Sequence, residues 1–305
     1  MNNQIDFMGK RKLAAIFSIT LLLVSIGSIA FKGLNLGLDF TGGTLIEVEY
    51  KAAPNLEEVR VQLLNSGYQD VVVQNFGAST SVLVRLSESF NDKVRQEVVT
   101  SLAATGEDVH LKRAEFVGAQ VGEELREQGG LGLLLALGLV MIYVALRFQF
   151  KFSVGAVAAL IHDVIIVVGF FSVLGWDFDL TVLAALLAVI GYSLNDTIVV
   201  ADRIRENFRL LRKIEPLEVI NISLTQTLSR TVVTSLTTIL VLLALYFFGG
   251  EMINGFAKAL LVGVFIGTYS SIYVASNILL LMGITKEDLI APVVDKEGEG
   301  IDEMP

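Results

Sequence analysis

The side chains best suited to ion chemistry lie within or beside long apolar runs of this sequence. Asp196 lies in the run at residues 180–201, and Arg230 immediately precedes the run at residues 231–248. Inside a membrane an ionisable side chain costs roughly 3 kcal/mol, so each residue needs a compensating partner. At about 1.5 Å per residue, Asp196 lies ~9 Å and Arg230 ~12 Å from the middle of its span, toward the same side. These depths predict contact between the carboxylate and the guanidinium group.

Polar residues near this pair extend it into a seam across the apolar runs. Ser193 and Asn195 lie within one helical turn of Asp196. Further hydroxyl groups follow the face of Arg230, at Thr227, Thr234, Thr237 and Thr238. A polar seam therefore runs into the apolar slab, and we expect Asp196 to have a functional role. Arg230 could instead extend its long side chain to the membrane surface. The side chain of Asp196 is too short to reach that surface.

A second pair, His162 and Asp163, lies near the middle of the apolar run at residues 153–174. A carboxylate beside an imidazole can have its pKa moved toward neutrality, so the two residues could form a proton-binding pair. It could equally form a hydrogen bond between helices with a structural role. His162 and Ser193 together could also suggest an intramembrane serine hydrolase. The sequence has no glycine two residues after Ser193 and no evident oxyanion hole, and we therefore expect no enzyme.

The composition indicates the environment that must position these residues. Hydrophobic residues make up 53% of the 305 residues, more than in an average soluble domain. The formal net charge is −9, with acidic residues concentrated at 57–127 and 287–303, and gives no reason to expect a nucleic-acid partner. Cysteine is absent, which excludes disulfide bonds and thiolate metal sites. We expect a lipid bilayer as the main solvent, no metal centre and no cofactor.

Six apolar runs are each long enough to cross a bilayer, which takes about 20 residues. They lie at residues 13–31, 129–147, 153–174, 180–201, 231–248 and 256–282. The first run is too long for a signal peptide, so we retain it as a helix. Lysine and arginine cluster on one side of these spans, at residues 10–12, 147–151 and 203–213. The positive-inside rule then places both termini in the cytoplasm, with a tail at 1–12, a basic loop at 202–229 and an acidic tail at 283–305. Residues 128–282 form the five-helix part of the bundle.

A small α+β domain is expected at residues 32–127, on the periplasmic side between the first two spans. Alternating apolar residues predict strands at 44–50, 71–76, 82–86 and 109–117. Helices are predicted at 54–66, opened by Pro54, and at 89–104, capped by Ser89. A turn at residues 77–80 joins the middle strands. The order βαββαβ is typical of a ferredoxin-like domain, in which two helices cover one antiparallel sheet.

Small residues predict how the helices pack and how the domain moves. One face of the last span carries only small residues at intervals of four, which would let another helix approach closely. These residues are Ala259, Gly263, Gly267, Ser271 and Ala275. Gly42 and Gly43 lie in the linker at residues 33–43 and would allow it to bend as a hinge.

Several motifs together identify a family resemblance. Residues 194–207 read LNDTIVVADRIREN, and residues 223–231 read SLTQTLSRT. Residues 37–43 read GLDFTGG, and residues 115–118 read EFVG. With these motifs, spread over most of the chain, the sequence resembles the SecF family, the smaller membrane subunit of the bacterial SecD–SecF protein-export complex. The AHD motif of that family appears here as IHD at residues 161–163.

The resemblance implies a subunit of a complex in the resistance-nodulation-division superfamily, located in the bacterial inner membrane beside the SecYEG channel. With a SecD-like subunit, the chain would draw unfolded polypeptide into the periplasm at the expense of a proton or sodium gradient. The aspartate and the arginine that line the ion path of the family match Asp196 and Arg230. A further aspartate of that path belongs to SecD and is missing from this chain.

We predict a cycle in which protonation of Asp196 weakens its contact with Arg230, shifts the bundle and tilts the outer domain about residues 33–43. Two other functions stay open. An ion-coupled small-molecule antiporter of the same superfamily would share the charged seam but would have a substrate pocket and work without a SecD-like subunit. In a purely structural scaffold, Asp196→Asn would leave function intact.

Overall fold

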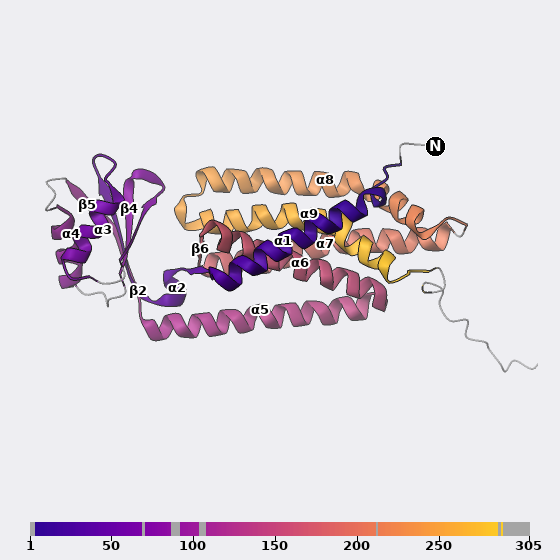
Figure 1. Cartoon of the computed structure of the whole chain (residues 1–305), viewed down its shortest axis with the longest axis horizontal. Helices are drawn as coiled ribbons and strands as arrows, with labels where there is room; N and C mark the ends of the chain where they lie inside the picture. The colour runs from indigo at the N-terminus through magenta and orange to yellow at the C-terminus, as the bar shows by residue number, and fades with distance from the viewer. Residues whose placement is uncertain are drawn as a thin grey trace, which may run out of the picture.

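Six long helices lie side by side, and a small α+β domain stands at one end of them (Figure 1). The structure, a computed structural model, describes residues 4–68, 71–86, 92–103, 108–211, 213–285 and 288. The long helices are α1 (Arg11–Phe31), α5 (Ala119–Arg147), α6 (Phe150–Leu174), α7 (Leu180–Leu210), α8 (Pro216–Phe248) and α9 (Asn254–Leu281). Each is long and apolar enough to cross a membrane, which confirms the six predicted spans.

Three helices continue well beyond their apolar runs. α5 begins at Ala119, inside the range predicted for the outer domain, and α7 ends only at Leu210. α8 begins at Pro216, which fits the first helical turn because its missing N–H has no partner to lose there. Most of the predicted basic loop at 202–229 is therefore helix. Hydropathy detects only the apolar part of a helix, whereas the backbone hydrogen bonds continue into polar residues.

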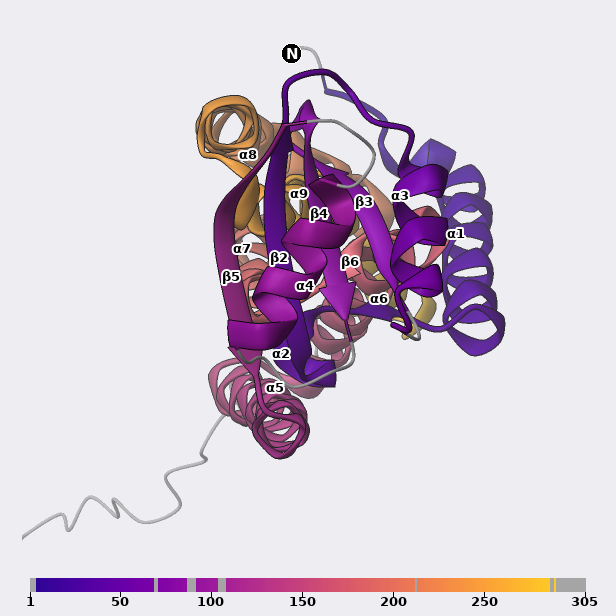
Figure 2. The ribbon, with the colours of Figure 1, turned by 90° about the vertical axis from the view of Figure 1, so that its left-hand side faces the viewer.

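The α+β domain has the predicted ferredoxin-like arrangement. Its strands are β2 (Gly43–Tyr50), β3 (Val72–Phe76), β4 (Ala78–Leu86) and β5 (Val109–Val117), and its helices are α3 (Leu56–Asn65) and α4 (Asp92–Ala103). The strand order is β3-β4-β2-β5, and each neighbouring pair is antiparallel. Figure 2 looks onto α3 and α4, with the sheet behind them and the bundle behind the sheet. The open face of the sheet is thus turned toward the bundle.

Local details of this domain differ from the predictions. Alternation along β2 buries Ile46, Val48 and Tyr50 among the core residues of the domain. The cap of α3 is Asn55 and not Pro54, because the Asn55 side chain accepts a hydrogen bond from the Glu57 N–H. The four-residue turn at 77–80 is wrong, since β4 already begins at Ala78, directly after Gly77 at φ 74°. The predicted cap at Ser89 lies outside the described residues.

A short segment that hydropathy did not reveal attaches the domain to the bundle. β1 (Asn35–Leu36) pairs in parallel with β6 (Asp177–Phe178), which lies between α6 and α7. α2 (Leu38–Thr41) follows, and its Asp39 accepts a hydrogen bond of 3.0 Å from the Leu180 N–H at the start of α7. Gln74 on β3 donates to Asp177 at 2.9 Å, and Arg85 on β4 donates to the Leu36 carbonyl at 2.8 Å. The linker therefore contacts the start of α7, and the sheet contacts β1 and β6 beside it.

Gly42 and Gly43 meet a steric requirement at the junction of domain and bundle. Their φ angles are 67° and 117°, which disfavour residues with a Cβ atom. A Cβ on Gly42 would lie 2.7 Å from Ala119 Cα, and one on Gly43 would lie 2.4 Å from the Leu86 carbonyl oxygen. These glycines allow the backbones to touch. Their service as a hinge stays a prediction.

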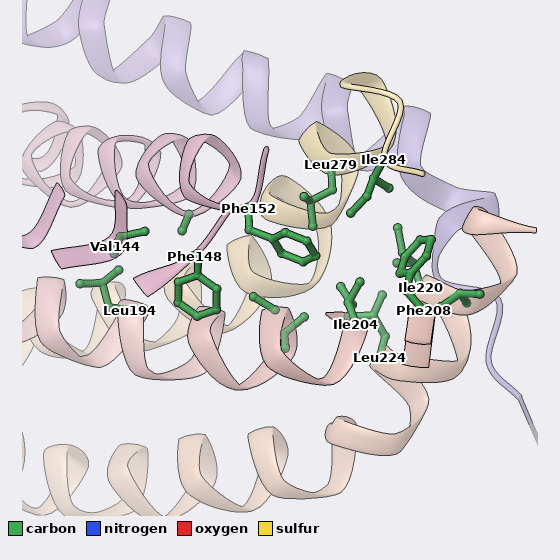
Figure 3. Packing of buried hydrophobic residues seen from close by; sticks show 14 of the residues in the cluster. Val144, Phe148, Phe152, Leu194, Ile204, Phe208, Ile220, Leu224, Leu279 and Ile284 are labelled. Atoms are coloured by element: carbon green, nitrogen blue, oxygen red, sulfur yellow. The ribbon is translucent and has the colours of Figure 1, made fainter. Parts of the chain in front are cut away.

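The bundle has a continuous apolar core toward the end opposite the α+β domain. Side chains from α5, α6, α7, α8 and α9 meet there (Figure 3), and the largest include Phe148, Phe152, Phe208 and Ile220. α1 packs against α6 with little space between backbones, since a Cβ on Gly169 would lie 2.8 Å from Ser25 Cα. This packing holds together α6, α7, α8 and α9, the four helices that carry the buried carboxylates and their hydroxyl partners.

Candidate ion-binding site

Asp196 is a buried carboxylate held between two other helices. Its side chain is 8% exposed. Thr231 on α8 donates a hydrogen bond of 2.7 Å to Oδ1, and Ser271 on α9 donates one of 2.6 Å to Oδ2. Hydroxyl bonds to a charged carboxylate are about twice as strong as bonds between neutral groups, so deprotonated Asp196 draws α8 and α9 onto α7.

Arg230 does not contact Asp196, and the predicted ion pair is wrong for this structure. Its side chain lies on the exposed side of α8, with no hydrogen bond or ion pair to any described residue. The buried face of α8 carries Thr227, Thr231 and Ser235. One residue turns a helix by about 100°, so a match in depth did not ensure a match in direction. Thr231 occupies the place that the sequence suggested for Arg230.

The other polar residues of the predicted seam divide into two groups. Asn195 is exposed on α7 and has no hydrogen bond to any described residue. The exposed threonines of α8 donate to their own helix, for example Thr234 to the Arg230 carbonyl at 3.0 Å. Inside the bundle, Tyr192 donates to Ser235 at 3.1 Å, and Ser235 shares a hydrogen bond of 2.7 Å with Thr268 on α9. The buried polar contacts therefore run between α7, α8 and α9.

His162 and Asp163 form a second buried site on α6. His162 Nδ1 lies 2.9 Å from Asp163 Oδ1, and the two side chains are 3% and 0% exposed. Asp163 Oδ2 accepts hydrogen bonds from Ser193 on α7 and from Ser270 on α9, the latter at 2.7 Å. The opposite ring nitrogen, His162 Nε2, is buried without a hydrogen-bond partner among the described residues. The hydrogen bonds to α7 and α9 agree with the structural alternative for this pair and leave its role in the ion path a prediction.

The small residues of α9 set the distance at which these hydroxyl groups reach the carboxylates. A Cβ on Gly263 would lie 2.2 Å from Val189 Cγ2, and one on Gly267 would lie 3.2 Å from Ser193 Cβ. The predicted small face, including the fully buried Ala259, thus packs against α7 within the chain. Ser271 was expected only to pack, yet it is a donor to Asp196.

Thr231 and Ser270 were missed by the sequence interpretation. A residue pattern could have pointed to them: Thr231 continues the face of Thr227, and Ser270 is next to a residue of the small face. Hydroxyl groups are common in membrane helices as donors to their own backbone, so this signal alone is weak. Their role became visible only through the partners on α6 and α7.

The donor set can hold a proton or a sodium ion on Asp196. A carboxylate with hydroxyl oxygens beside it offers hard oxygen ligands. Among the described residues there is no group of three or more histidine, aspartate or glutamate side chains that could bind a transition metal. The arrangement places one carboxylate and two hydroxyl oxygens from three helices around a single point.

Comparison with known families covers both parts of the chain. The family described as "Protein export membrane protein SecD/SecF, C-terminal" matches residues 97–285, and the "SecD/SecF GG Motif" matches residues 27–54. A "Protein translocase subunit SecF" from Pseudomonas aeruginosa is 54% identical over 290 residues, covering 94% of each chain. The protein of the same name from Vibrio alginolyticus is 52% identical and covers 99% of this chain and 97% of its own.

Solved structures show the same fold. The crystal structure of SecDF from Thermus thermophilus, described as a translocon-associated membrane protein, matches with a TM-score of 0.85 at 41% identity. The match covers 92% of this chain but 39% of the SecDF chain. A second SecDF structure, in a super-membrane-facing form, matches with a TM-score of 0.69 at 40% identity and the same coverage. The six long apolar helices and these relatives together show a multi-pass membrane protein that belongs to the SecF family.

Proposed function

We propose that this chain works with a SecD-like subunit and the SecYEG channel to assist the translocation of unfolded polypeptides, using a transmembrane proton or sodium gradient. The observation that carries the proposal is the buried carboxylate of Asp196, held by hydroxyl groups from two neighbouring helices. The names of its relatives, protein translocase subunits, supply the type of work. The chain itself performs no enzymatic step and needs no cofactor in this proposal.

Binding of an ion changes how tightly three helices are joined. When Asp196 is neutralised, its bonds to Thr231 and Ser271 become bonds between neutral groups and lose about half their strength. α8 and α9 can then shift relative to α7. One charge moving through 100 mV supplies about 2.3 kcal/mol, so a few ions provide enough free energy for such a rearrangement.

The start of α7 connects this shift to the α+β domain. Asp39 bonds the Leu180 N–H, and β1 pairs with β6 just before α7, so movement of α7 displaces the linker below the sheet. Two SecDF structures match this chain at equal coverage and nearly equal identity, yet with TM-scores of 0.85 and 0.69. The matched region therefore differs in shape between them, which supports a mobile arrangement in the family.

A SecD-like subunit would cover the exposed sides of α7 and α8. Arg230 and Asn195 are exposed there, and a guanidinium group facing lipid costs several kcal/mol unless it is paired or reaches the membrane surface. We propose that a carboxylate of the SecD-like subunit lies against Arg230 and completes the ion path. The SecDF chain extends well beyond the 39% that this chain matches, which leaves room for such a partner.

The proposal includes a location and an orientation. The chain lies in the inner membrane of a bacterium, with both termini in the cytoplasm and the α+β domain in the periplasm. The support is the excess of lysine and arginine at the end of the bundle opposite that domain, at residues 10–12, 147–151 and 203–213.

Purification from native membranes tests the proposal against the antiporter alternative. A tagged chain should bring a SecD-like subunit with it in stoichiometric amount, and the complex should bind SecYEG. Cells depleted of the chain should accumulate unprocessed secreted proteins, and wild-type chain should relieve this. A chain that purifies alone and whose loss alters only resistance to small molecules would contradict the proposal and favour an antiporter.

A further inference from the structure

Two neighbouring residues of α9 connect the two buried carboxylates. Ser270 donates to Asp163 on α6 at 2.7 Å, and Ser271 donates to Asp196 on α7 at 2.6 Å. Ser193 also bonds Asp163, and it precedes Asp196 by one helical turn on the same helix. α9 therefore bonds both carboxylates, and α7 both carries Asp196 and bonds Asp163 through Ser193. A change at one carboxylate acts on helices that hold the other.

Each of the two serines has an alternative acceptor of the same kind, a backbone carbonyl of its own helix. Ser270 lies 3.1 Å from the Gly267 carbonyl, and Ser271 lies 3.0 Å from the Thr268 carbonyl, each within α9. A hydroxyl group has one proton to donate. When a carboxylate becomes neutral and a poorer acceptor, its serine can turn to the helix carbonyl at no loss of hydrogen bonding. Each serine can thus release its carboxylate independently.

His162 gives the site on α6 an open position for a proton. Its Nδ1 is bonded to Asp163, while its buried Nε2 has no partner among the described residues. α1 packs along α6, since Ser28 bonds Ser172 at 2.8 Å and a Cβ on Gly169 would lie 2.8 Å from Ser25 Cα. Ser18 shares a hydrogen bond of 2.9 Å with Tyr269, whose ring centroid is 6.3 Å from that of His162.

We propose that His162 and Asp163 form a second proton-binding site, coupled to Asp196 through α9. A proton that binds at His162 Nε2 gives an imidazolium ion, and loss of the proton from Nδ1 to Asp163 Oδ1 leaves a neutral imidazole and a neutral carboxyl group. Ser270 then turns toward the Gly267 carbonyl and loosens α9 from α6. This inference rests on the proposed function for its purpose, since the second site would make ion binding at Asp196 depend on a second proton.

Few other titratable groups face this site. α7 contributes Asp196, and α9 contributes Tyr269 and Tyr273, which lie with ring centroids 5.4 Å apart. α1 carries its charged residues only at its start, in Arg11 and Lys12. No charged side chain other than Asp196 and the pair itself lies on the described parts of α1, α6, α7 and α9 near this depth. Coupling observed between the sites would therefore belong to these two carboxylates.

The chain contains only two histidines, and this makes the site directly observable. His110 lies exposed on β5, so His110→Gln leaves His162 as the single histidine. The full chain, labelled with ¹⁵N-histidine and reconstituted with its partner subunit in lipid nanodiscs, would be titrated by NMR of the imidazole nitrogens. We expect the Nε2 signal of His162 to change with pH, and the midpoint of that change to move when Asp196→Asn is added, because interacting sites do not bind protons independently.

The coupling should depend on the serines of α9. Ser270→Ala should reduce the shift caused by Asp196→Asn to less than about a third of its size, and Ser270→Thr should preserve it. Ser276→Ala is the matched control, because Ser276 is buried on α9 and has no hydrogen-bond partner among the described residues. Replacing sodium by potassium at constant ionic strength should leave the midpoint unchanged.

Three results would overturn the inference. The His162 signal could fail to change with pH, its midpoint could be the same with and without Asp196→Asn, or its midpoint could change with the sodium concentration. Because the readout is a titration and not export, each result is separate from the proposed function. A chain that shows the coupling but has no effect on export would contradict the proposed function alone.

Discussion

Thr231 Oγ1 lies 2.7 Å from Asp196 Oδ1, and this hydrogen bond joins α8 to α7 inside the bundle. Thr231→Val keeps the shape of the side chain but removes the donor, which leaves a buried carboxylate oxygen unsatisfied. The expected cost is about 1–3 kcal/mol in the free energy of unfolding in detergent. Thr234→Val is the control, because the exposed Thr234 bonds only its own helix and should cost less than about 0.5 kcal/mol. Equal effects of the two variants would show that the contact with Asp196 contributes little.

Arg230→Gln should separate folding from assembly. Since Arg230 is exposed and has no partner among the described residues, the isolated chain should keep its unfolding free energy within about 0.5 kcal/mol of wild type. Association with the SecD-like subunit should weaken at least tenfold, because a charge pair across that interface loses one member. Arg230→Lys should bind with intermediate strength, since lysine offers a point charge in place of a planar fork.

The isolated chain also tests whether Arg230 pairs with Asp196 in the free subunit. If they do not pair, the effects of Arg230→Gln and Asp196→Asn on unfolding should add within about 0.5 kcal/mol. Coupling of more than 1 kcal/mol, as a rough threshold for residues in contact, would favour the direct ion pair that the sequence suggested.

The glycine face of α9 should tolerate no large side chain. Gly263→Leu would push a side chain into Val189, which a Cβ alone would approach to 2.2 Å, and overpacking typically costs about 1–3 kcal/mol. Separation of α9 from α7 would also move Ser271 away from Asp196. Gly138→Leu on α5 is the control, because no atom lies within 4 Å of a Cβ at that position. Similar unfolding free energies for both variants would contradict this packing.

Residues 43–117 should fold alone, since the core of the α+β domain comes from its own strands and helices. A random-coil circular dichroism spectrum of this fragment would refute independent folding.

In the α+β domain the exposed Asp108 accepts a hydrogen bond from Lys51. This hydrogen bond, together with the smaller effect of the lysine charge, lowers the pKa of Asp108 below 3.8. The contact therefore adds stability above pH 3.8 that is lost as the pH falls through the lower, folded value. NMR titration of the carboxyl group should show the low midpoint, and Lys51→Met should return it to the ordinary value.

The sequence predicted the parts of this structure that depend on local periodicity. Spans follow from apolar length, and the strands of the α+β domain follow from alternation, as in Ile46, Val48 and Tyr50. The pairing of β1 with β6 was not predictable, because two-residue strands whose paired residues lie 142 positions apart carry no periodic signal. The partner of Asp196 was missed for another reason: depth along a helix follows from counting residues, whereas the direction of a side chain around it depends on how the helices pack. The predicted partner of Asp196, Arg230, and the observed partner on α8, Thr231, are adjacent in the sequence.

Export into inverted membrane vesicles, measured with and without an ion gradient, tests the central claim most directly. The quantity is the ratio of the two rates for a secreted precursor, in vesicles that hold no other copy of the chain. Thr197→Val is the control beside Asp196, since the buried Thr197 hydroxyl has no hydrogen-bond partner among the described residues. We predict that the gradient accelerates export with the wild type and with Thr197→Val, and that Asp196→Asn reduces the ratio to about one while the complex still assembles. A full response to the gradient in Asp196→Asn would contradict ion coupling through this carboxylate.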